Sequence, residues 1–295
     1  MASSRASVAW RAMHCGFVTL VGRPNVGKSS LVNTLCGTKV TIVSPRPQTT
    51  RRQVRGIANG NDHQIVFVDT PGLHKPVTAL GERINDTAMS SLGDVDVVCL
   101  VLDATQPFGR GDQWVIDRLA GVARMSNVVV IVNKCDAVSR EDVFAYLASI
   151  SGLDAAVYHP VSARTGKGLD DLRATLVSRL PEGPALYPAD MRSDTDELTW
   201  IAELVRERLL YETHEELPHS IATRVTEYEW PRIRCEIVVE RESQKGMVIG
   251  KGGALLKRVG SKVRESLPDG AYLELFVVVD PQWQRRPDRI ERLGY

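Results

Sequence analysis

The chain has 295 residues, enough for a well-buried core and more naturally two domains than one. Apolar residues make up 43% and charged residues 25%, as in an ordinary globular protein, and the net charge of +1 excludes neither an anionic nor a neutral partner. The five cysteines are scattered, which indicates reduced thiols. No apolar run approaches the roughly 18 residues of a membrane span, so we expect a cytoplasmic protein.

The start of the chain, MASSRASVAWRAMH, is interpreted as an N-terminal extension over residues 1–14. It lacks the apolar core of a secretory signal, but it is rich in Arg, Ser and Ala, so an organellar presequence is the alternative. The first strand is expected from about Cys15, which leaves little to cleave and favours a simple extension.

Apolar runs then predict the strands of an α/β domain over residues 15–181. The runs are Gly16–Val21, Ile65–Val68, Val97–Leu102 and Val128–Val132. They are continuous rather than alternating, which is typical of strands covered on both faces, and the chain between them is long enough for crossover helices. Helical spacing follows at Lys28–Leu35 and Leu169–Leu180. The pattern predicts a doubly wound, mostly parallel sheet.

The prolines and glycine of PEGPALYP, residues 181–188, end that pattern, so we place a linker at 182–194 and a smaller α+β domain with a C-terminal tail at 195–295. The predicted elements of the second domain are a helix at Asp196–Glu212, strands at Ile221–Tyr228 and Ile233–Glu240, a glycine-broken helical stretch at Ser243–Ser266 and a strand at Ala271–Val279.

A phosphate-binding motif lies between the first strand and the first helix. GRPNVGKS, Gly22–Ser29, matches G-x-x-x-x-G-K-[ST], and its strand and helix neighbours disfavour a chance glycine turn. In such a loop backbone N–H groups wrap the phosphates, Lys28 reaches the outer two, and the Ser29 hydroxyl binds Mg²⁺. The predicted nucleotide-binding residues here are Gly22, Arg23, Pro24, Asn25, Val26, Gly27, Lys28, Ser29 and Ser30.

A second motif, DTPG, follows the run IVFV. Asp69 ends a predicted strand and is expected to reach the same Mg²⁺ through a coordinated water, and Gly72 leaves room for its N–H to approach the γ-phosphate. Alone this tetrapeptide is a common turn, so its order and spacing carry the prediction. The expected nucleotide-binding residues are Asp69, Thr70, Pro71 and Gly72.

Two further motifs predict which base is bound. NKCD follows the run VVVIV, and the Asp136 carboxylate can accept hydrogen bonds from N1–H and the 2-amino group of guanine, which adenine lacks. The tripeptide SAR offers a backbone contact to guanine O6. Either motif alone would be read as a surface turn. The predicted residues are Asn133, Lys134, Asp136, Ser162, Ala163 and Arg164.

These four elements in this order resemble the guanine-nucleotide-binding domain of the translation-factor-related GTPases. The resemblance places a first switch segment at Ser44–Arg52, with Thr50 as the Mg²⁺ and γ-phosphate contact and Thr49 as the alternative. The metal ligands expected are therefore Ser29, Thr50 and Asp69. A group of arginines in and after this segment is interpreted as a solvated basic face: Arg46, Arg51, Arg52 and Arg55.

The second domain contains VIGKGG. From Arg241 to Arg264 there are seven Lys or Arg residues and one acid, and Gly250 to Gly253 form a G-x-x-G loop that lets a sugar-phosphate backbone come close. A lone G-x-x-G is as often a helix C-cap, but the order of predicted elements is that of a type II KH domain. We expect an RNA groove along this loop and the strand Ile233–Glu240. Predicted RNA contacts are Lys245, Gly246, Ile249, Gly250, Lys251, Gly252, Gly253, Lys257 and Arg258.

A P-loop GTPase domain followed by this KH domain, with QTTR, DTPGLHKP, ERESQKGMVIGKGG and a terminal WQRR…RLGY, closely resembles the Era family over essentially the whole chain after residue 14. The resemblance implies a ribosome-assembly GTPase that uses GTP, GDP and Mg²⁺. Its expected partners are the 3′ region of 16S ribosomal RNA and the small ribosomal subunit. It also implies peripheral contact with the inner membrane. DNA is not expected as a partner.

The same resemblance bears on catalysis, because the family replaces the catalytic glutamine by a hydrophobic residue. Leu73 is therefore expected to point away from the γ-phosphate. Related GTPases with an asparagine at the position of Asn25 use its side-chain oxygen to hold K⁺ against the phosphates, so slow, K⁺-stimulated turnover is our hypothesis. The catalytic residues expected are Lys28, Thr50, Gly72 and Asn25.

Two other functions fit parts of the sequence. A plain RNA chaperone with an inactive GTPase platform is disfavoured by the intact Lys28, Ser29, Asp69 and NKCD. A tRNA-modification GTPase would need a terminal reactive cysteine, whereas this sequence ends RLGY, and a tandem GTPase would need a second P-loop. The basic tail Trp283–Arg292 is interpreted as solvated with occasional RNA contact, and an anionic membrane surface is the alternative.

Overall fold

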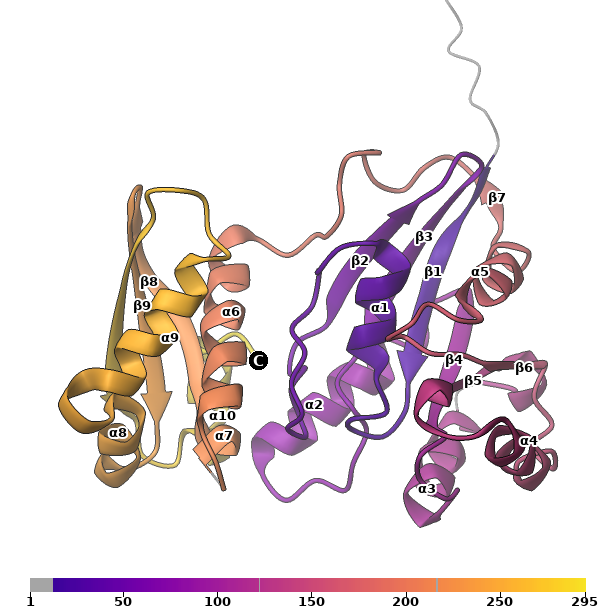
Figure 1. Ribbon diagram of the computed structural model, residues 1–295, viewed down its shortest axis with the longest axis horizontal. Coiled ribbons are helices and arrows are strands. Elements are labelled where there is room, and N and C mark those ends of the chain that lie inside the picture. The colour runs from indigo at the N-terminus through magenta and orange to yellow at the C-terminus, as the bar shows by residue number, and fades with distance from the viewer. Residues whose placement is uncertain (1–12, 122, 216) are drawn as a thin grey trace, which may run out of the picture.

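The computed structural model describes residues 13–121, 123–215 and 217–295, and its first part is a sheet with helices on both faces (Figure 1). The strands follow the order β2-β3-β1-β4-β5-β6, with β7 beside β1. All neighbours along this order are parallel except β2, which is antiparallel to β3, and β7 is antiparallel to β1. The predicted doubly wound, mostly parallel sheet is confirmed. The bounds are β1 (Met13–Val21), β2 (Val54–Asn59), β3 (His63–Asp69), β4 (Val97–Asp103), β5 (Val129–Asn133), β6 (Val157–Pro160) and β7 (Glu182–Gly183).

A hydrophobic core lies on each face of this sheet. Helices α1 (Lys28–Cys36) and α5 (Leu169–Val177) pack against one face. Helices α2 (Ala79–Ser90), α3 (Arg110–Leu119) and α4 (Arg140–Ser149) cover the other. Single 3₁₀ turns lie at Met125–Asn127 and Cys135–Ala137. Because parallel strands end at the same edge, the loops after β1, β3 and β5 meet there.

Two details of this domain differ from the sequence interpretation. β1 begins at Met13, so the end of the expected extension is strand, and residues 1–12 lie outside the described residues. Strand β2 was not predicted, because its sequence VRGIAN is short and carries Arg55 and Gly56. Gly56 is needed there, since an added Cβ would lie 2.8 Å from Cys36 Sγ on α1.

The expected linker is fastened to the edge of the sheet. Glu182 and Gly183 form β7, and Gln64 Oε1 accepts hydrogen bonds from the backbone N–H groups of Leu186 and Tyr187 at 2.7 and 2.9 Å. Further along, the Ile57 N–H donates to the carbonyl of Arg192 at 2.8 Å. The linker is therefore hydrogen-bonded along β2 and β3.

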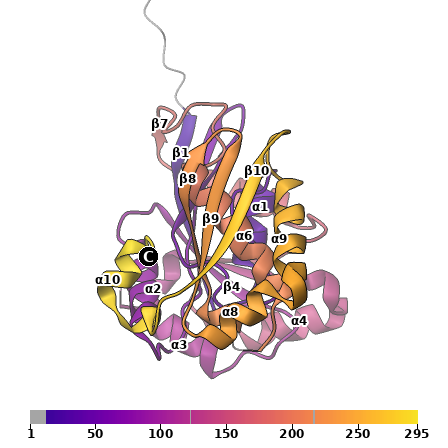
Figure 2. The ribbon, with the colours of Figure 1, turned by 90° about the vertical axis from the view of Figure 1, so that its left-hand side faces the viewer.

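The second domain packs helices of its central part on one face of a small sheet ordered β10-β9-β8, and the C-terminal tail packs on the other (Figure 2). β9 is antiparallel to β8 and parallel to β10. Its elements in chain order are α6 (Glu197–Glu212), α7 (Leu217–Ser220), β8 (Ala222–Glu229), β9 (Arg232–Val239), α8 (Glu242–Ile249), a 3₁₀ turn (Lys251–Gly253), α9 (Ala254–Arg264) and β10 (Tyr272–Val279). Apart from the short α7, this is the predicted order of a type II KH domain.

The C-terminal tail packs its apolar residues between the two domains, whereas Arg285, Arg286 and Arg292 are exposed, so its interpretation as a solvated segment holds only for its charged side chains. It forms a 3₁₀ turn at Trp283–Arg285 and helix α10 (Pro287–Arg292). Trp283 is fully buried and its indole N–H donates to the carbonyl of Ser220 at 3.0 Å. Its core cluster includes Leu80 and Ile84 of α2, across the domain boundary. The tail is basic in sequence, but its apolar residues determine where it packs.

Candidate functional site

The P-loop residues turn tightly between β1 and α1. Gly27 has φ of 98°, and an added Cβ would lie 2.3 Å from the Asn133 side-chain nitrogen. That nitrogen donates to the carbonyl of Val26 at 2.9 Å, which ties the P-loop to the end of β5. No side chain caps the start of α1, so its first N–H groups stay available to an anion, as the motif requires.

Lys28 lies buried beneath this loop. Its Nζ donates to the carbonyls of Gly22 and Arg23 at 3.1 and 3.0 Å. Burial lowers the Lys28 pKa to about 8, against a smaller opposing effect of Asp69. Phosphate charge beside Nζ would favour the ammonium form, so the side chain suits a polyphosphate ligand.

The predicted metal ligands come together at the edge of the P-loop. Ser29 Oγ lies 2.9 Å from Thr50 Oγ1, and Thr50 Oγ1 lies 3.4 Å from Asp69 Oδ2. Adjacent ligands of an octahedral Mg²⁺ are about 2.9 Å apart, because each lies about 2.0 to 2.1 Å from the ion. The two hydroxyls therefore have the spacing of neighbouring Mg²⁺ ligands.

Asp69 supplies the charge that a cation needs. Asp69 is fully buried, and among the described residues its Oδ1 has no hydrogen-bond partner. Burial raises the pKa of the Asp69 carboxyl, despite nearby Lys28. A divalent cation would favour the ionised carboxylate, so these residues fit Mg²⁺. Sequence reasoning missed Thr41, whose hydroxyl donates to Asp69 Oδ2 at 2.8 Å.

Thr49 has a different position from Thr50. Its hydroxyl lies 2.6 Å from Ser44 Oγ and 2.7 Å from the carbonyl of Arg46, within the first switch segment. Thr50 is the threonine that faces Ser29. The geometry favours the first choice made from the sequence.

The loop after β3 brings Gly72 against the P-loop. An added Cβ on Gly72 would lie 2.8 Å from the backbone nitrogen of Pro24, so only glycine fits. The Thr70 hydroxyl donates to the carbonyl of Leu20 at 2.9 Å and fixes the preceding turn, and Pro71 is buried. Leu73 is 1% exposed and belongs to the core under α2 and α3, so it points away from the pocket, as expected.

A side-chain bridge that the sequence did not reveal joins the first switch segment to the loop after β3. His74 Nδ1 lies 3.1 Å from the carbonyl of Gly72, and His74 Nε2 lies 2.7 Å from Gln48 Nε2. With the proton on Nδ1, the imidazole donates to Gly72 and accepts from Gln48. Gln48 also lines the pocket, so the bridge links its wall to the loop after β3.

The guanine-recognition residues are assembled at the ends of β5 and β6. Asn133 Oδ1 accepts from the Ala163 N–H at 3.0 Å, and Asp136 Oδ1 accepts from the Ser162 hydroxyl at 2.5 Å. That hydrogen bond, followed by smaller effects that include Arg164, lowers the Asp136 pKa. Arg164 pairs with Asp136 Oδ2 at 2.6 Å but is 77% exposed in its side chain, so it can turn away when a base arrives.

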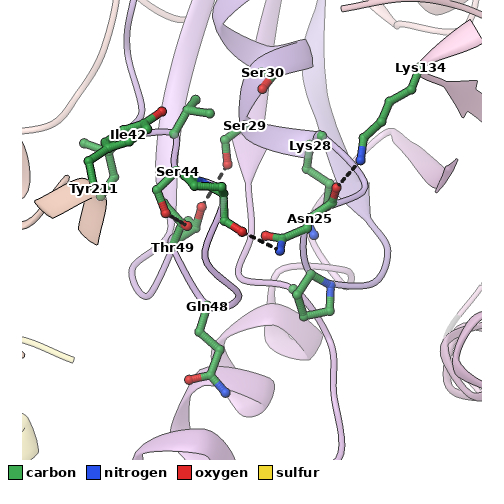
Figure 3. Close-up of a pocket in the computed structure, with 16 residues that line it drawn as sticks. Asn25, Lys28, Ser29, Ser30, Ile42, Ser44, Gln48, Thr49, Lys134 and Tyr211 are labelled. Atoms are coloured by element: carbon green, nitrogen blue, oxygen red, sulfur yellow. Dashed lines mark hydrogen bonds between the residues drawn. The ribbon is translucent and has the colours of Figure 1, made fainter. Parts of the chain in front are cut away.

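Lys134 closes the other side of the P-loop. Its Nζ donates to the backbone carbonyl of Asn25 at 2.7 Å and pairs with Asp103 at 2.6 Å (Figure 3). Asp103 ends β4 and was not singled out from the sequence. Asn25 has φ of 66°, and its Nδ2 donates to the carbonyl of Pro45 at 3.0 Å, which joins the P-loop to the first switch segment.

A pocket of about 540 Å³ lies between these elements (Figure 3). P-loop residues, the first switch segment, Gly72 and Lys134 line it. Asp136 and the SAR residues are not part of its lining, so the pocket matches the sugar-phosphate part of a nucleotide better than the base. Tyr211 of α6 also lines it, and no motif marked that residue.

The three arginines of the first switch segment contact the second domain, so for Arg46, Arg51 and Arg52 the interpretation as a solvated face is wrong. Arg51 is 2% exposed and donates to the carbonyls of Ile221 and His219 at 2.6 and 2.9 Å. Arg52 donates to the carbonyl of Leu293, and Arg46 donates to that of Thr213 at 3.0 Å. Arg55 pairs with Asp194 of the linker at 3.0 Å. Carbonyl acceptors leave no sequence pattern, so these partners could not be foreseen.

The GKGG loop in the second domain is shaped by its glycines. Gly250, Gly252 and Gly253 have φ of 73°, 58° and 77°. Lys251 and Gly252 are exposed, and no atom lies within 4 Å of a Cβ added at Gly252, so a backbone can approach closely. Of the other predicted contacts, Gly246 and Lys257 are exposed, and Lys245 and Ile249 are half-buried.

A pocket of about 280 Å³ lies beside this loop, and its sheet wall is β10. We expected the strand Ile233–Glu240 at this groove, but β9 lies in the middle of the sheet and none of its residues lines the pocket. The pocket is lined by Gly253, Leu256, Lys257, Gly260, Arg264, Tyr272, Leu273 and Leu275. Arg264 was missed from the sequence, and predicted Arg258 instead pairs with Glu212 at 2.7 Å.

Comparison with known proteins follows this two-domain division. A family model described as a 50S ribosome-binding GTPase matches residues 17–134, and a KH domain model matches residues 216–284. GTPase Era of Mycobacterium sp. (strain KMS) is 46% identical over 294 residues, which cover 95% of this chain and 98% of that protein. This chain belongs to the Era family. GTPase Era of Mycobacterium tuberculosis (strain CDC 1551 / Oshkosh) is also 46% identical, over 96% of this chain and 99% of that protein.

Solved Era structures have the same arrangement. A variant of Aquifex aeolicus Era bound to GDP.AlF4− is 38% identical with a TM-score of 0.90, and it covers 96% of this chain and 99% of that chain. Era in complex with MgGDPNP and nucleotides 1506–1542 of 16S ribosomal RNA has a TM-score of 0.92 at the same identity and coverage. As an Era family member, the chain is a GTPase. Within the described ranges, none of the helices has the length and apolarity needed to cross a membrane.

Proposed function

We propose that this Era family GTPase binds GTP and GDP with Mg²⁺ in the pocket between the P-loop and the first switch segment. The observation that carries the proposal is the meeting of Ser29, Thr50 and Asp69, with the two hydroxyls 2.9 Å apart beside a buried carboxylate oxygen. Ser29 and Thr50 would hold the ion directly and Asp69 through water. Mg²⁺, when bound, would neutralise charge that develops on the phosphates.

Calorimetry with GDP and a non-hydrolysable GTP analogue, with and without Mg²⁺, tests this assignment. Asp69→Asn should lose the Mg²⁺ dependence of nucleotide affinity while it keeps the volume of the side chain. Asp117→Asn, on the exposed face of α3, is a matched control that should leave the dependence unchanged. If Asp69→Asn responds to Mg²⁺ like the parent chain, the metal assignment fails.

Asp136 reads the base in this proposal. Its position at the end of β5, with Oδ1 engaged by Ser162 and Oδ2 by the exposed Arg164, supports a carboxylate that is oriented for two donors of guanine. Asp136→Asn should weaken GDP binding and favour xanthosine diphosphate, which presents an acceptor where guanine presents its 2-amino donor. A variant that keeps the preference for guanine would contradict this role.

Lys28, Thr50, Gly72 and Asn25 form the proposed catalytic group. Lys28 and the Gly72 N–H would stabilise the charge on the transferred phosphoryl group, and Thr50 would fix the metal. With Leu73 in the core, its side chain does not orient the attacking water, so the basal rate should be slow. Single-turnover hydrolysis with the parent chain and Leu73→Met should give similar rates.

Asn25 is the proposed K⁺ ligand. Its Nδ2 is engaged by Pro45, which leaves the side-chain oxygen available at the rim of the pocket. Turnover should rise when NaCl is replaced by KCl, and Asn25→Ala should lose that response. Equal rates in the two salts, or a K⁺ response that survives in Asn25→Ala, would remove K⁺ from the mechanism.

The second domain is proposed to bind the 3′ region of 16S ribosomal RNA through the GKGG loop and the neighbouring groove, within assembly of the small ribosomal subunit. Support comes from the open, positively charged loop and from the related Era structure that contains nucleotides 1506–1542 of that RNA. Crosslinking in cells followed by sequencing of the bound RNA is the test. Recovery of unrelated RNAs, without enrichment of this region, would contradict the proposal.

Nucleotide state and RNA binding are proposed to be coupled through the first switch segment. Arg206 of α6, fully buried, donates to the carbonyl of Thr49, next to the proposed metal ligand Thr50. A shift of Thr50 on loss of the γ-phosphate would therefore act on α6 directly. Equal RNA affinity with GDP and with a non-hydrolysable GTP analogue would disprove the coupling.

Cytoplasmic location with peripheral contact at the inner membrane is a separate part of the proposal. Its support is the family resemblance. Flotation with vesicles of anionic and of neutral lipid tests it, and absence from both vesicle fractions would contradict it.

A further inference from the structure

The second domain contributes a side chain to the nucleotide pocket. Tyr211 belongs to α6, yet it lines the same pocket as the P-loop, beside Ile42 and Ser44 (Figure 3). Tyr211 is 48% exposed, and no hydrogen bond joins its side chain to the other residues that line the pocket. Within the described residues the phenol has no hydrogen-bond partner, so it can donate to or accept from a molecule in the pocket.

Contacts on both sides of Tyr211 hold it there. One turn earlier, Glu207 Oε1 accepts from the N–H of Val43 at 2.8 Å, and its other oxygen pairs with Lys39. Two residues later, the carbonyl of Thr213 accepts from Arg46 at 3.0 Å. The end of α6, which carries Tyr211, therefore binds the segment of the first domain that lines this side of the pocket.

Helical spacing explains why these groups act together. Glu203, Glu207 and Tyr211 follow one another four residues apart, so they share one face of α6, and His214 comes just after the helix ends. Glu203 pairs with the arginine that holds Thr49, and His214 Nδ1 lies 2.9 Å from Arg46 Nη2. That face is thus the one turned to the first domain, and Tyr211 is its member at the pocket.

We infer that Tyr211 contacts the sugar-phosphate part of the bound nucleotide and is a positioning residue supplied by the RNA-binding domain. Burial raises the pKa of the Tyr211 phenol, so its hydroxyl stays protonated and can donate to a sugar or phosphate oxygen. The inference rests on the proposed nucleotide site. It adds that the site is complete only while α6 is docked, so undocking of the second domain speeds nucleotide release.

Calorimetry of the full chain with unlabelled GDP and a non-hydrolysable GTP analogue tests the contact; fluorescent labels on the ribose would disturb the part of the nucleotide in question. Tyr211→Ala should weaken binding about 3- to 10-fold, the range of one lost hydrogen bond and its packing. Tyr211→Phe should recover only part of the loss. Phe144→Ala removes a similarly exposed aromatic side chain of α4 and should bind like the parent chain.

A second comparison separates a contact from general loosening of the domains. Glu207→Gln weakens the contacts of Glu207 with Val43 and Lys39. It should lower GDP affinity in the parent chain but not in Tyr211→Ala, because that variant lacks the side chain that these contacts position. Tyr211→Ala with unchanged affinity, or losses that simply add in the double variant, would overturn the inference. If the parent chain itself bound no guanine nucleotide, the failure would be that of the proposed site.

Discussion

The P-loop and the first switch segment lie on opposite sides of one pocket, yet their side chains have different partners. Lys28 and Asn133 make their contacts within the first domain. Arg46, Arg51 and Arg52 direct their guanidinium groups into the second domain. One wall of the pocket is therefore fixed by its own fold, and the other is shared with the RNA-binding domain.

This difference indicates that a change in the bound nucleotide would reach the second domain through the first switch segment. Arg51 is buried and forms no ion pair within the described residues. Its guanidinium donates hydrogen bonds to backbone carbonyls of the second domain, and it lies near the rings of Trp283 and Tyr295, whose centroids are 6.0 and 5.9 Å away. A buried guanidinium is costly without these acceptors. Movement of the first switch segment must therefore carry the second domain along or break this set of contacts.

The largest expected effect comes from the P-loop side. Lys28→Ala removes the ammonium that faces the phosphates and should lower single-turnover GTP hydrolysis by about 10²- to 10³-fold. RNA affinity of the nucleotide-free protein should stay unchanged, because Lys28 contacts only the first domain. If Lys28→Ala also lowered RNA affinity, the P-loop wall would be linked to the second domain as the switch wall is.

The switch side should behave in the opposite way. Arg51→Ala leaves buried carbonyls unpaired at the domain boundary and should lower the free energy of unfolding by about 2 to 4 kcal/mol, measured by chemical denaturation. It should also remove any difference in RNA affinity between the GDP state and the GTP-analogue state.

Arg124→Ala is the matched control for Arg51→Ala, since Arg124 is exposed. It should change the free energy of unfolding by less than about 0.5 kcal/mol. If the two variants had the same free energy of unfolding, Arg51 would have to be interpreted as a solvated residue.

The same contrast explains how much the sequence could predict. The positions of the P-loop, Asp69 and Asp136 at the ends of strands could be predicted because each belongs to a local motif that follows an apolar run, and parallel strands bring their ends together. Arg51 was misread because its acceptors are backbone carbonyls about 170 residues away, and every residue type has a carbonyl.

Residues that act by position alone were missed for a related reason. Thr41 and Tyr211 belong to no motif, and only the fold brings the first to Asp69 and the second to the pocket. In the tail, Trp283 and Ile290 decide the burial, although charged residues dominate the composition there. An apolar residue every few positions in a short basic stretch is too weak a periodic signal to predict docking.

The buried Lys28 makes nucleotide binding sensitive to pH. Its pKa in the nucleotide-free protein is lowered from 10.5 to about 8, so above that pH the amine is largely uncharged and must take up a proton to pair with phosphate. GDP affinity should therefore fall as the pH rises above about 8, by up to about tenfold per pH unit. Calorimetry in buffers of different ionisation enthalpy should find an uptake approaching one proton at pH 9. Affinity that is flat from pH 7 to 9.5 would contradict the buried-amine description.

The smallest expected effect separates two adjacent basic residues in the second domain. Lys257 lines the groove beside the GKGG loop, whereas Arg258 is paired with Glu212 of α6. Lys257→Ala should weaken binding of single-stranded RNA about 3- to 5-fold and reduce its salt dependence by about one charge. Arg258→Ala should change the affinity less than about twofold, because its guanidinium already has a carboxylate partner. Equal losses would mean that RNA pulls Arg258 away from Glu212, and α6 would then sense RNA on one face and the first switch segment on the other.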